Sequence, residues 1–310
     1  MIGRLCLSPA VLAIALAALC ATCRRTPPAP SPQRTDATVP TQANPAAPPH
    51  WLHATAGEAL RQVLRTAKPR IIGFGEFHQK ISSAKVRSAV RRFSEQMVAT
   101  LAPAASDLIV ETWITEGSCG EDERRVVKSV EKTTERPVTT EDEVVTLLKR
   151  AKQLGVQPHI LKVGCDDYKL LARSRAGKVD YEKLLSMITR HLQQKATQVV
   201  AARRRADGAG EPKAVALYGG ALHNDLFPLE GLEAFSYAAA LQKLTGGRYA
   251  ELDLYVPEYV EGDEAMRREP WYPLLRLAGP RHVVLIERGP RSYILLLQRG
   301  YGSPTSRPAR

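Results

Sequence analysis

The sequence predicts an α/β protein with a mainly parallel sheet flanked by helices and a C-terminal antiparallel hairpin. Short apolar runs typical of buried strands alternate with segments whose apolar residues recur every three or four positions, as in amphipathic helices. This alternation is typical of parallel sheets built from strand–helix–strand units. Near the C-terminus two apolar runs, 283–287 and 292–297, flank the turn signal Gly289-Pro290, which predicts the hairpin.

The first residues predict an export signal. Residues 1–23 carry one early cation, Arg4, and then an apolar stretch that is too short to span a membrane. Cys20 and Cys23 lie where this stretch ends, which resembles the signal of a bacterial lipoprotein with its lipid-bearing cysteine. The small residues before Cys23 suit lipidation there better than at Cys20. The sequence therefore predicts a protein anchored by lipid to the bacterial envelope, at the outer membrane or the periplasmic face; soluble secretion and an uncleaved anchor are alternatives.

Composition then divides the rest of the chain. Residues 24–50 are crowded with Pro, Thr, Ala and Ser and predict a disordered tether. Residues 51–300 predict a single α/β domain, long enough for one sizeable core, and residues 301–310 a disordered tail. No second apolar run approaches membrane length.

The domain is expected to begin with a helix and two strands. Thr55 and Glu58 have the spacing of a capping box at a helix start. A buried strand is expected over 71–74, a helix capped by Ser83 follows, and 108–111 predicts the second strand.

The middle of the domain is more polar. Residues 114–139 form a charged excursion, either a lid or binding loop or a solvated surface helix. Thr140 with Glu143 predicts the next helix start, Gly155 its end, and 160–163 the third strand.

The remaining elements are a long helix over 180–205, a fourth strand over 215–218, a fifth over 249–256, and the hairpin. The formal net charge is +12, but the cations are scattered, and Arg203, Arg204 and Arg205 form the only tight cluster, which we interpret as a solvated helix end. With no nucleic-acid motif present, the expected partners are the membrane, through the anchor, and an unidentified small molecule or peptide.

Acidic and imidazole side chains follow four of the predicted strands. They are Glu76, His78, Glu111, Asp166, Asp167 and His223. Because the carboxyl ends of parallel strands share one edge, where ligands bind, we expect the Glu and His residues to converge in one cleft. Two Glu and two His suit a divalent transition metal with room for water, and equally an acid/base set without metal. Asp166 and Asp167 fit helix caps better.

Glycines support this site. Gly75 and the pair Gly219-Gly220 lie where the backbone must approach something closely or adopt positive φ. Four other histidines are interpreted as structural: His53, His159, His191 and His282.

Three short motifs carry a family resemblance: IIGFGEFH at 71–78, IVETW at 109–113 and YGGALHN at 218–224. They resemble the superfamily that groups ChaN-like haem-binding-uptake lipoproteins, Tiki/TraB proteins and erythromycin esterases, over most of residues 58–256. This sequence has Gln79 where an acid often follows the motif histidine. The resemblance implies four site residues, whether catalytic or metal-binding: Glu76, His78, Glu111 and His223.

The resulting hypothesis is a hydrolase that activates water, with or without a metal. His78 or His223 acts as base, Glu76 orients it, and Glu111 positions the water or completes a metal shell. The alternative is a haem- or iron-binding uptake lipoprotein with Tyr218, His223 or His78 as axial ligand. A third reading is a surface protein with a degenerate site, held to the envelope by its cationic face.

Two cysteines, Cys119 and Cys165, lie in the domain. Export into an oxidising compartment permits a disulfide between them, which would link the charged excursion to the turn after the third strand. Two unpaired, partly buried thiols are the rival expectation.

Overall fold

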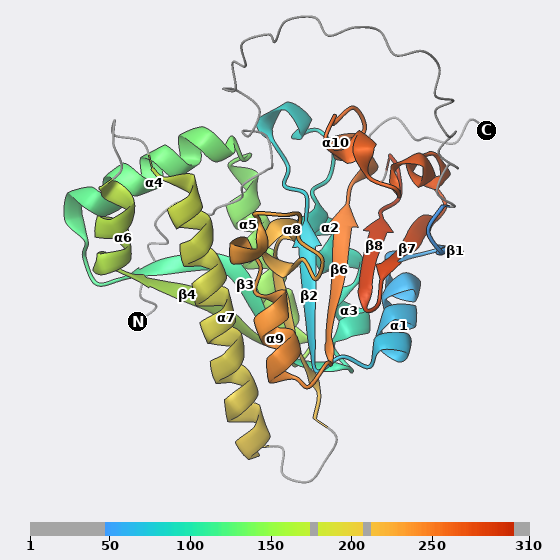
Figure 1. The fold of residues 1–310 in the computed structure, drawn as a ribbon, viewed down its shortest axis with the longest axis horizontal. Coiled ribbons are helices and arrows are strands. Elements are labelled where there is room, and N and C mark those ends of the chain that lie inside the picture. Colours follow the sequence, from blue (N-terminus) through green and yellow to red (C-terminus); the bar gives the residue numbers. More distant parts are fainter. Residues whose placement is uncertain (1–46, 174–178, 207–211, 301–310) are drawn as a thin grey trace, which may run out of the picture.

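A computed structural model describes residues 47–173, 179–206 and 212–300. Eight strands form one sheet in the order β1-β7-β8-β6-β2-β5-β3-β4 (Figure 1). The strands are β1 (His50–His53), β2 (Ile71–Glu76), β3 (Ala105–Glu116), β4 (Gln157–Gly164), β5 (Ala214–Gly220), β6 (Tyr249–Tyr255), β7 (Val283–Gly289) and β8 (Ser292–Leu296). The predicted signal segment with Cys20 and Cys23, the tail, and the tether up to residue 46 lie outside the described residues.

Helices connect the strands. They are α1 (Ala56–Ala67), α2 (Ala89–Gln96), α3 (Val98–Leu101), α4 (Gly120–Thr134), α5 (Thr139–Gln153), α6 (Cys165–Ala172), α7 (Tyr181–Ala206), α8 (Ala221–Asn224), α9 (Ala238–Leu244) and α10 (Pro257–Val260). Short 3₁₀ helices lie at Ile81–Ser83, Glu233–Phe235, Met266–Arg268 and Tyr272–Leu277.

The sheet is mainly parallel, as the sequence predicts. β2 lies between β5 and β6 and is parallel to both, and β3 is parallel to β4 and β5. β7 pairs antiparallel with β8, which confirms the predicted hairpin, and with β1 at the sheet edge. The β2–β5 register sets Glu76 beside Gly220.

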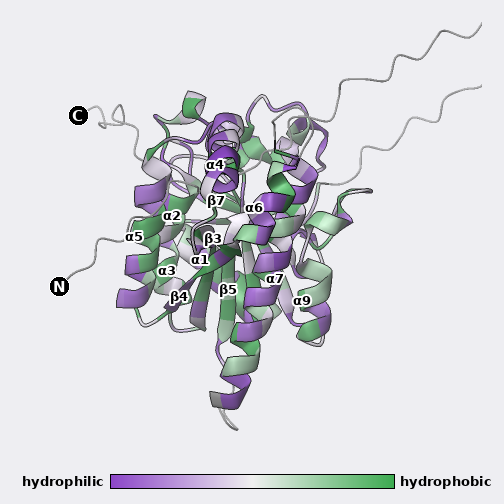
Figure 2. Cartoon of the chain, turned by 90° about the vertical axis from the view of Figure 1, so that its left-hand side faces the viewer, coloured by the Kyte–Doolittle hydropathy of each residue, from purple (hydrophilic) through white to green (hydrophobic). Residues whose placement is uncertain are grey.

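Helices cover both faces of the sheet, each over its own apolar core. Helices α1, α2, α3 and α5 pack on one face, and α4, α6, α7 and α9 on the other. Figure 2 views these two layers with the sheet between them; the apolar sides of α5 and α7 turn toward it. Because both faces are covered, the central strands are apolar almost throughout.

Several predicted boundaries are wrong. The strand expected over 71–74 continues to Glu76, and the strand expected to end at Glu111 runs to Glu116. The cap expected at Ser83 lies instead at Ser88, whose hydroxyl accepts from the Arg91 amide to begin α2. Ser83 closes a 3₁₀ turn by donating to the Lys80 carbonyl.

The capping box predicted at Thr140 and Glu143 is also wrong. Helix α5 begins one residue earlier, at Thr139, after Val138 as the N-cap without a side-chain bond. Glu143 does not reach back to its own helix start, because its carboxylate accepts a hydrogen bond from the Ser88 hydroxyl at 2.5 Å. Glu143 therefore makes a tertiary contact with Ser88 of α2 instead of the local capping contact that the pattern predicted.

The charged excursion is largely a helix. In α4 the residues Val126, Val127 and Val130 are buried on one side, and the helix packs against α6. A disulfide joins Cys119, just before α4, to Cys165, the first residue of α6, with Cα atoms 4.9 Å apart. This linkage is the pairing expected from the sequence.

Replacing both cysteines with serine is expected to lower the free energy of unfolding by about 4 kcal/mol, because the bridge closes a loop of 46 residues. Urea unfolding of the oxidised protein and of the double variant measures the difference. Reducing agent should bring the wild type to the midpoint of the variant and leave the variant unchanged. Coincident curves for both oxidised proteins would show that the bridge contributes nothing.

Among the helices of the described ranges, none combines the length and the apolar character that crossing a bilayer requires.

Candidate functional site

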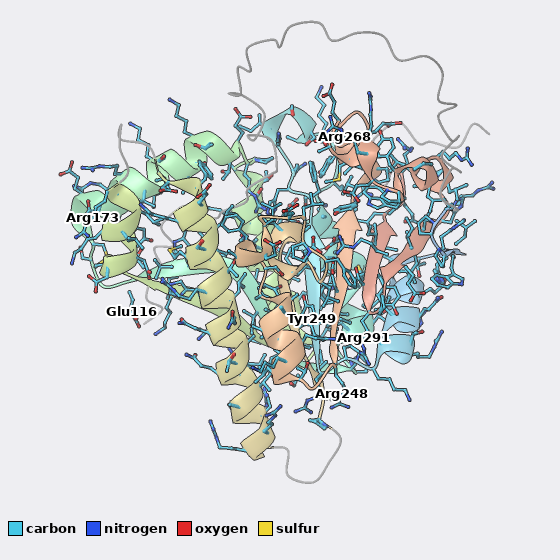
Figure 3. The ribbon with its side chains drawn as sticks, viewed as in Figure 1. Glu116, Arg173, Arg248, Tyr249, Arg268 and Arg291 are labelled. Atoms are coloured by element: carbon cyan, nitrogen blue, oxygen red, sulfur yellow. A yellow bond between two sulfur atoms is a disulfide. The ribbon has the colours of Figure 1, made fainter. Side chains whose placement is uncertain are left out.

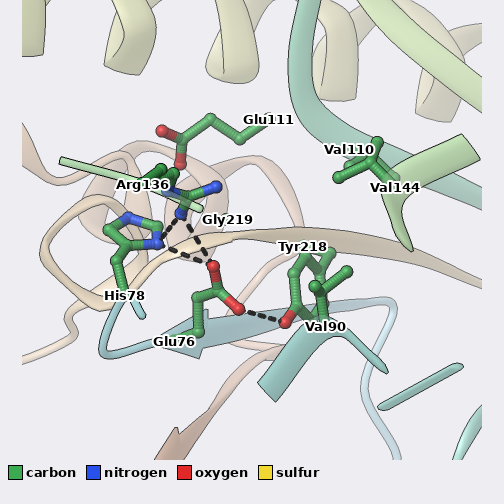
Figure 4. A pocket seen from close by; sticks show the side chains of 9 residues that line it. All are labelled: Glu76, His78, Val90, Val110, Glu111, Arg136, Val144, Tyr218 and Gly219. Atoms are coloured by element: carbon green, nitrogen blue, oxygen red, sulfur yellow. Dashed lines mark hydrogen bonds and ion pairs between the residues drawn. The ribbon is translucent and has the colours of Figure 1, made fainter. Parts of the chain in front are cut away.

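A buried polar pocket lies at the C-terminal edge of β2, β3 and β5, under α2 and α5 (Figure 4). Its lining residues are Glu76, His78, Val90, Val110, Glu111, Arg136, Val144, Tyr218 and Gly219. The space that can hold the centre of a water-sized molecule is about 10 Å³, which is room for about one water molecule. Three of the four predicted site residues line this pocket, and His223 lies next to it.

The pocket exists because two strands separate. β3 pairs with β5 as far as Val110, opposite Tyr218. Beyond Val110 it pairs only with β4, where the register shifts between Ile109 and Trp113. Glu111 is the first residue after the separation, so its side chain reaches the opening although it lies within a strand rather than at a strand end.

Glu76 and His78 form a tightly bonded pair. His78 Nδ1 lies 2.7 Å from Glu76 Oε1, and both side chains are buried. The other carboxylate oxygen, Oε2, accepts a 2.5 Å hydrogen bond from the Tyr218 hydroxyl. A carboxylate beside Nδ1 fixes the tautomer in which Nδ1 carries the proton and Nε2 is the basic nitrogen.

Two glycines make room for these groups. A Cβ on Gly220 would lie 2.7 Å from His78 Nε2, and a Cβ on Gly219 would lie 2.4 Å from Glu111 Oε2. Both distances are shorter than any real carbon contact, so a side chain at either position would displace His78 or Glu111. This confirms the prediction that the backbone comes close to other groups at Gly219-Gly220.

Arg136 is the site residue that sequence reasoning missed. It lies between α4 and α5 in the charged excursion, and its side chain is 10% exposed. Its Nη2 donates to Glu76 Oε1 at 2.8 Å and lies against His78 Nδ1, as Figure 4 shows. Because guanidinium only donates and Nδ1 also donates, the two groups share the Glu76 oxygen rather than bond to each other.

Burial shifts the pKa values of both Glu76 and Arg136. Desolvation raises the pKa of Glu76, while the Arg136 charge and the Tyr218 hydrogen bond oppose that rise. Burial lowers the pKa of Arg136, and Glu76 opposes this. With donors from Arg136, Tyr218 and His78 at its two oxygens, the ionised form of Glu76 is the one that the site solvates.

Glu111 is the second buried carboxyl group of the pocket. Burial, with the nearby Glu76 charge as a smaller cause, raises the pKa of Glu111 to about 8, although a 2.7 Å hydrogen bond from the Gly220 amide to Oε2 opposes the rise. At neutral pH, Glu111 is therefore mostly protonated.

His223 lies on the far side of Glu111 from the pocket. Its Nδ1 donates to the Thr189 hydroxyl at 2.8 Å and to the Phe235 carbonyl at 3.1 Å, so Nε2 faces Glu111 Oε1 at 3.9 Å. Burial lowers the pKa of His223 to about 4. The side chain is thus neutral at pH 7, and its Nε2 faces the Glu111 carboxyl group.

Other polar residues at the predicted edge do not belong to the pocket. Asp166 and Asp167 lie in the first turn of α6; Asp166 is fully exposed beside Lys169, and Asp167 bonds to Arg190 and His191. His159 pairs with Asp107 at 2.8 Å, and His282 contacts the Leu277 carbonyl. Gln79 donates to the carbonyls of Ser83 and Val86 and does not bond to His78. The acidic partner of His78 is Glu76, two residues before it.

A divalent metal among the four predicted ligands would lie beside the Arg136 guanidinium. Arg136 places a cation against Glu76 Oε1 and His78, while Nδ1 of each histidine is bonded elsewhere and leaves Nε2 as the nitrogen that a metal would use. Across residues 47–173, 179–206 and 212–300, no group of three or more His, Cys, Asp or Glu side chains is placed to hold a metal ion.

Haem is too large for the pocket as it is described. The pocket has room for about one water molecule. The Tyr218 hydroxyl bonds to Glu76, and His223 Nε2 faces Glu111, so neither residue presents an axial ligand to an open slot.

Replacing Glu111 with Gln is expected to stabilise the protein between pH 6 and 8 and to flatten its dependence on pH. Below about pH 4.5 both states carry the proton; from there to about pH 8 the unfolded state loses it and the folded state keeps it. The stability of the wild type therefore falls by up to about 1.4 kcal/mol per pH unit across that window. The Gln amide oxygen still accepts from Gly220.

Urea unfolding at pH 5 and pH 8 tests this. Every other titratable group is present in both proteins, so the difference between their curves reports on Glu111. Parallel stability curves for the wild type and Glu111→Gln would contradict the raised pKa.

Fold and pocket together define an α/β protein with a buried carboxylate–histidine site at the C-terminal edge of its parallel strands. No protein-family model matches the chain, and no curated protein matches it. Among solved structures, the chain is similar to "The structure of the type III effector HopBA1", with a TM-score of 0.38 and 14% identity over 83% of this chain and 100% of that chain. A likeness of this degree says nothing about function.

Proposed function

We propose that this chain is an exported, lipid-anchored hydrolase of the bacterial envelope, in the superfamily of ChaN-like, Tiki/TraB and erythromycin-esterase proteins. The observation that carries the proposal is the bond between His78 Nδ1 and Glu76 Oε1 within a pocket sized for a water molecule. A histidine whose Nδ1 is held by a buried carboxylate has its Nε2 available as a general base.

His78 takes the part of the base rather than His223. Proton transfer from water to His78 Nε2 generates the attacking hydroxide, and Glu76 stabilises the imidazolium that forms. His223 is a poorer base, because burial lowers its pKa to about 4, and it does not line the pocket.

Arg136 and Glu111 complete the chemistry. Attack on an ester or amide carbonyl places negative charge on its oxygen, and the Arg136 guanidinium is the cation within the pocket that can stabilise this charge. Glu111 carries a proton at neutral pH and can donate it to the leaving oxygen or nitrogen. His78 then returns its proton to solvent, and Glu111 regains one.

Support for export comes from the N-terminal sequence and from the disulfide, which suits an oxidising compartment.

Assaying the purified full-length chain against panels of carboxylic esters and of peptides tests the proposal. We expect saturable hydrolysis of one class, with an acid limb from His78 and an alkaline limb near pH 8 from Glu111. A visible spectrum after haem addition is recorded in parallel. A Soret band together with no turnover on either panel would replace the hydrolase with the haem-binding alternative.

A further inference from the structure

The pocket around Glu76 is closed. Its space for the centre of a water-sized molecule is about 10 Å³, and the side chains of Glu76, His78 and Glu111 are 5–6% exposed. An ester or amide carbonyl with its two substituents is larger than the one water molecule that this space holds. If the site hydrolyses such a bond, as proposed above, part of its cover must move before a substrate reaches His78.

The turn between α4 and α5 contributes to the cover of this pocket. We call residues 135–138 the gate turn. Its Arg136 side chain lines the pocket and donates to Glu76 Oε1 at 2.8 Å. The Ile81 amide donates to the Glu135 carbonyl at 2.8 Å. These bonds join the gate turn to β2 and to the segment that follows it.

The closed position of the gate turn carries conformational and polar costs. Glu135 caps the C-terminus of α4 with φ 48° and ψ 35°, in the left-handed region that favours glycine. Among the described residues, neither Arg136 Nε nor Thr140 Oγ1, both buried, has a hydrogen-bond partner. A buried donor without a partner opposes the arrangement that buries it. Lifting the turn would relieve these costs in exchange for the bonds that hold it down.

Helix α4 is fixed at its other end. The disulfide at Cys119 holds the start of the helix to α6, and Val126, Val127 and Val130 are buried along one side. A movement that opens the pocket is therefore confined to the gate turn, with Glu135 as its pivot.

We propose that the gate turn opens to admit the substrate and closes over it, pivoting at Glu135 and carrying the Arg136 guanidinium away from Glu76 and back. In the open position water reaches Arg136 Nε, and Glu135 leaves the left-handed region. Closure returns the guanidinium to the carbonyl oxygen that it stabilises and excludes bulk water from the reaction.

The reactivity of His78 toward diethyl pyrocarbonate measures how often the gate turn opens, and it needs no substrate. The reagent carbethoxylates an unprotonated imidazole nitrogen that it can reach, and peptide mass spectrometry of the full-length chain gives the rate at each histidine. His50, exposed on β1, controls for reagent concentration. His223 is 3% exposed and lies outside the pocket lining, so it stays protected while the fold persists.

Ile81→Pro is expected to raise the rate of His78 modification about fivefold, because it removes the amide that bonds to Glu135 and one hydrogen bond usually contributes about that factor. Ile81 begins a 3₁₀ helix and follows Lys80 in an extended conformation, so proline fits there. The Ile81 side chain is 61% exposed, so little packing is lost. Ile81→Ala is the matched control, since it removes the same side chain, keeps the amide and should leave the rate unchanged.

Glu135→Gly is expected to have the opposite effect. Glycine adopts the left-handed conformation of the closed turn without the penalty of a side chain, so His78 should react about fivefold more slowly. Lys68→Gly is the matched control, because Lys68 is the left-handed C-cap of α1 at the opposite edge of the sheet. Arg70, two residues later, donates its amide to the Arg248 carbonyl, and Figure 3 labels Arg248 at that lower end of the sheet.

Faster modification in Ile81→Pro and slower modification in Glu135→Gly, with both controls like the wild type, would support the gate. Equal His78 rates in all five proteins, or a control that changes as much as its partner variant, would overturn it. The ester and peptide panels separate this result from the proposed function. Hydrolysis with equal His78 rates would remove only the gate, and shifted His78 rates without hydrolysis would keep the gate and remove the hydrolase.

Discussion

Replacing His78 with Gln is expected to lower kcat/KM for hydrolysis by about 10²- to 10⁴-fold, the usual contribution of a general base. The Gln amide can still donate to Glu76, which keeps the buried carboxylate bonded, but it has no nitrogen that accepts a proton from water. Initial rates on the substrate class found by the panels measure the effect, and thermal unfolding shows whether the fold persists.

His191→Gln is the matched control, because His191 on α7 pairs with Asp167 on α6, outside the pocket. It should hydrolyse at the rate of the wild type. A His78→Gln enzyme with full activity would remove His78 from the chemistry, and the acid limb of the pH profile would have to be assigned elsewhere.

Breaking the ion pair between Glu76 and Arg136 is expected to have the largest effect on stability. Glu76→Gln leaves the buried guanidinium without the carboxylate that it bonds, which typically costs about 3–5 kcal/mol. Arg136→Met alone leaves the buried Glu76 carboxylate without the cation that it pairs with. The double variant removes both charges, and because a matched apolar replacement of a buried pair is often neutral, most of the loss should be recovered.

A double-mutant cycle by urea unfolding measures this coupling. Glu95→Gln serves as the surface control, because Glu95 pairs with Arg87 and Arg91 in partly exposed positions and its loss should cost less than about 1 kcal/mol. Additive losses from Glu76→Gln and Arg136→Met would show that the two charges do not depend on each other. All three Glu76 and Arg136 variants should lose hydrolysis, whatever their stability.

The parts of the fold that local pattern determines were predictable. Buried strands such as 71–76 and 214–220 have continuous apolar sequences, and the hairpin has its own turn signal. The starts of α2 and α5 could not be predicted. For α2, Ser83 and Ser88 are chemically equivalent caps, and only packing selects between them. Glu143, which the pattern assigned to a local cap, bonds to Ser88 across the helix pair instead.

The candidate site likewise contains residues that the sequence predicts and one residue, Arg136, that it does not. Glu76, His78 and His223 could be predicted because parallel strands bring their C-terminal ends to one edge. Glu111 was predicted on the same ground, but it lies within β3 and reaches the pocket because β3 leaves β5 after Val110. Arg136 could not be predicted, since its position follows from where α4 ends and α5 begins, 60 residues from Glu76 in sequence. Pro137, which breaks the charged excursion directly after it, was the local sign that the chain turns there.

The short strand β1 determines how the domain would respond to tension. Only its first residue, His50, falls in the predicted tether over 24–50, and all four of its residues pair antiparallel with β7 at the outer edge of the sheet. Tension applied to the chain before residue 47 would therefore act first on the four residue pairs between β1 and β7. Peeling β1 away would uncover the edge of β7, while β8 and β6 would still separate the break from β2, β5 and β3. Tension applied before residue 47 would therefore be taken up three strands away from Glu76 and the pocket around it.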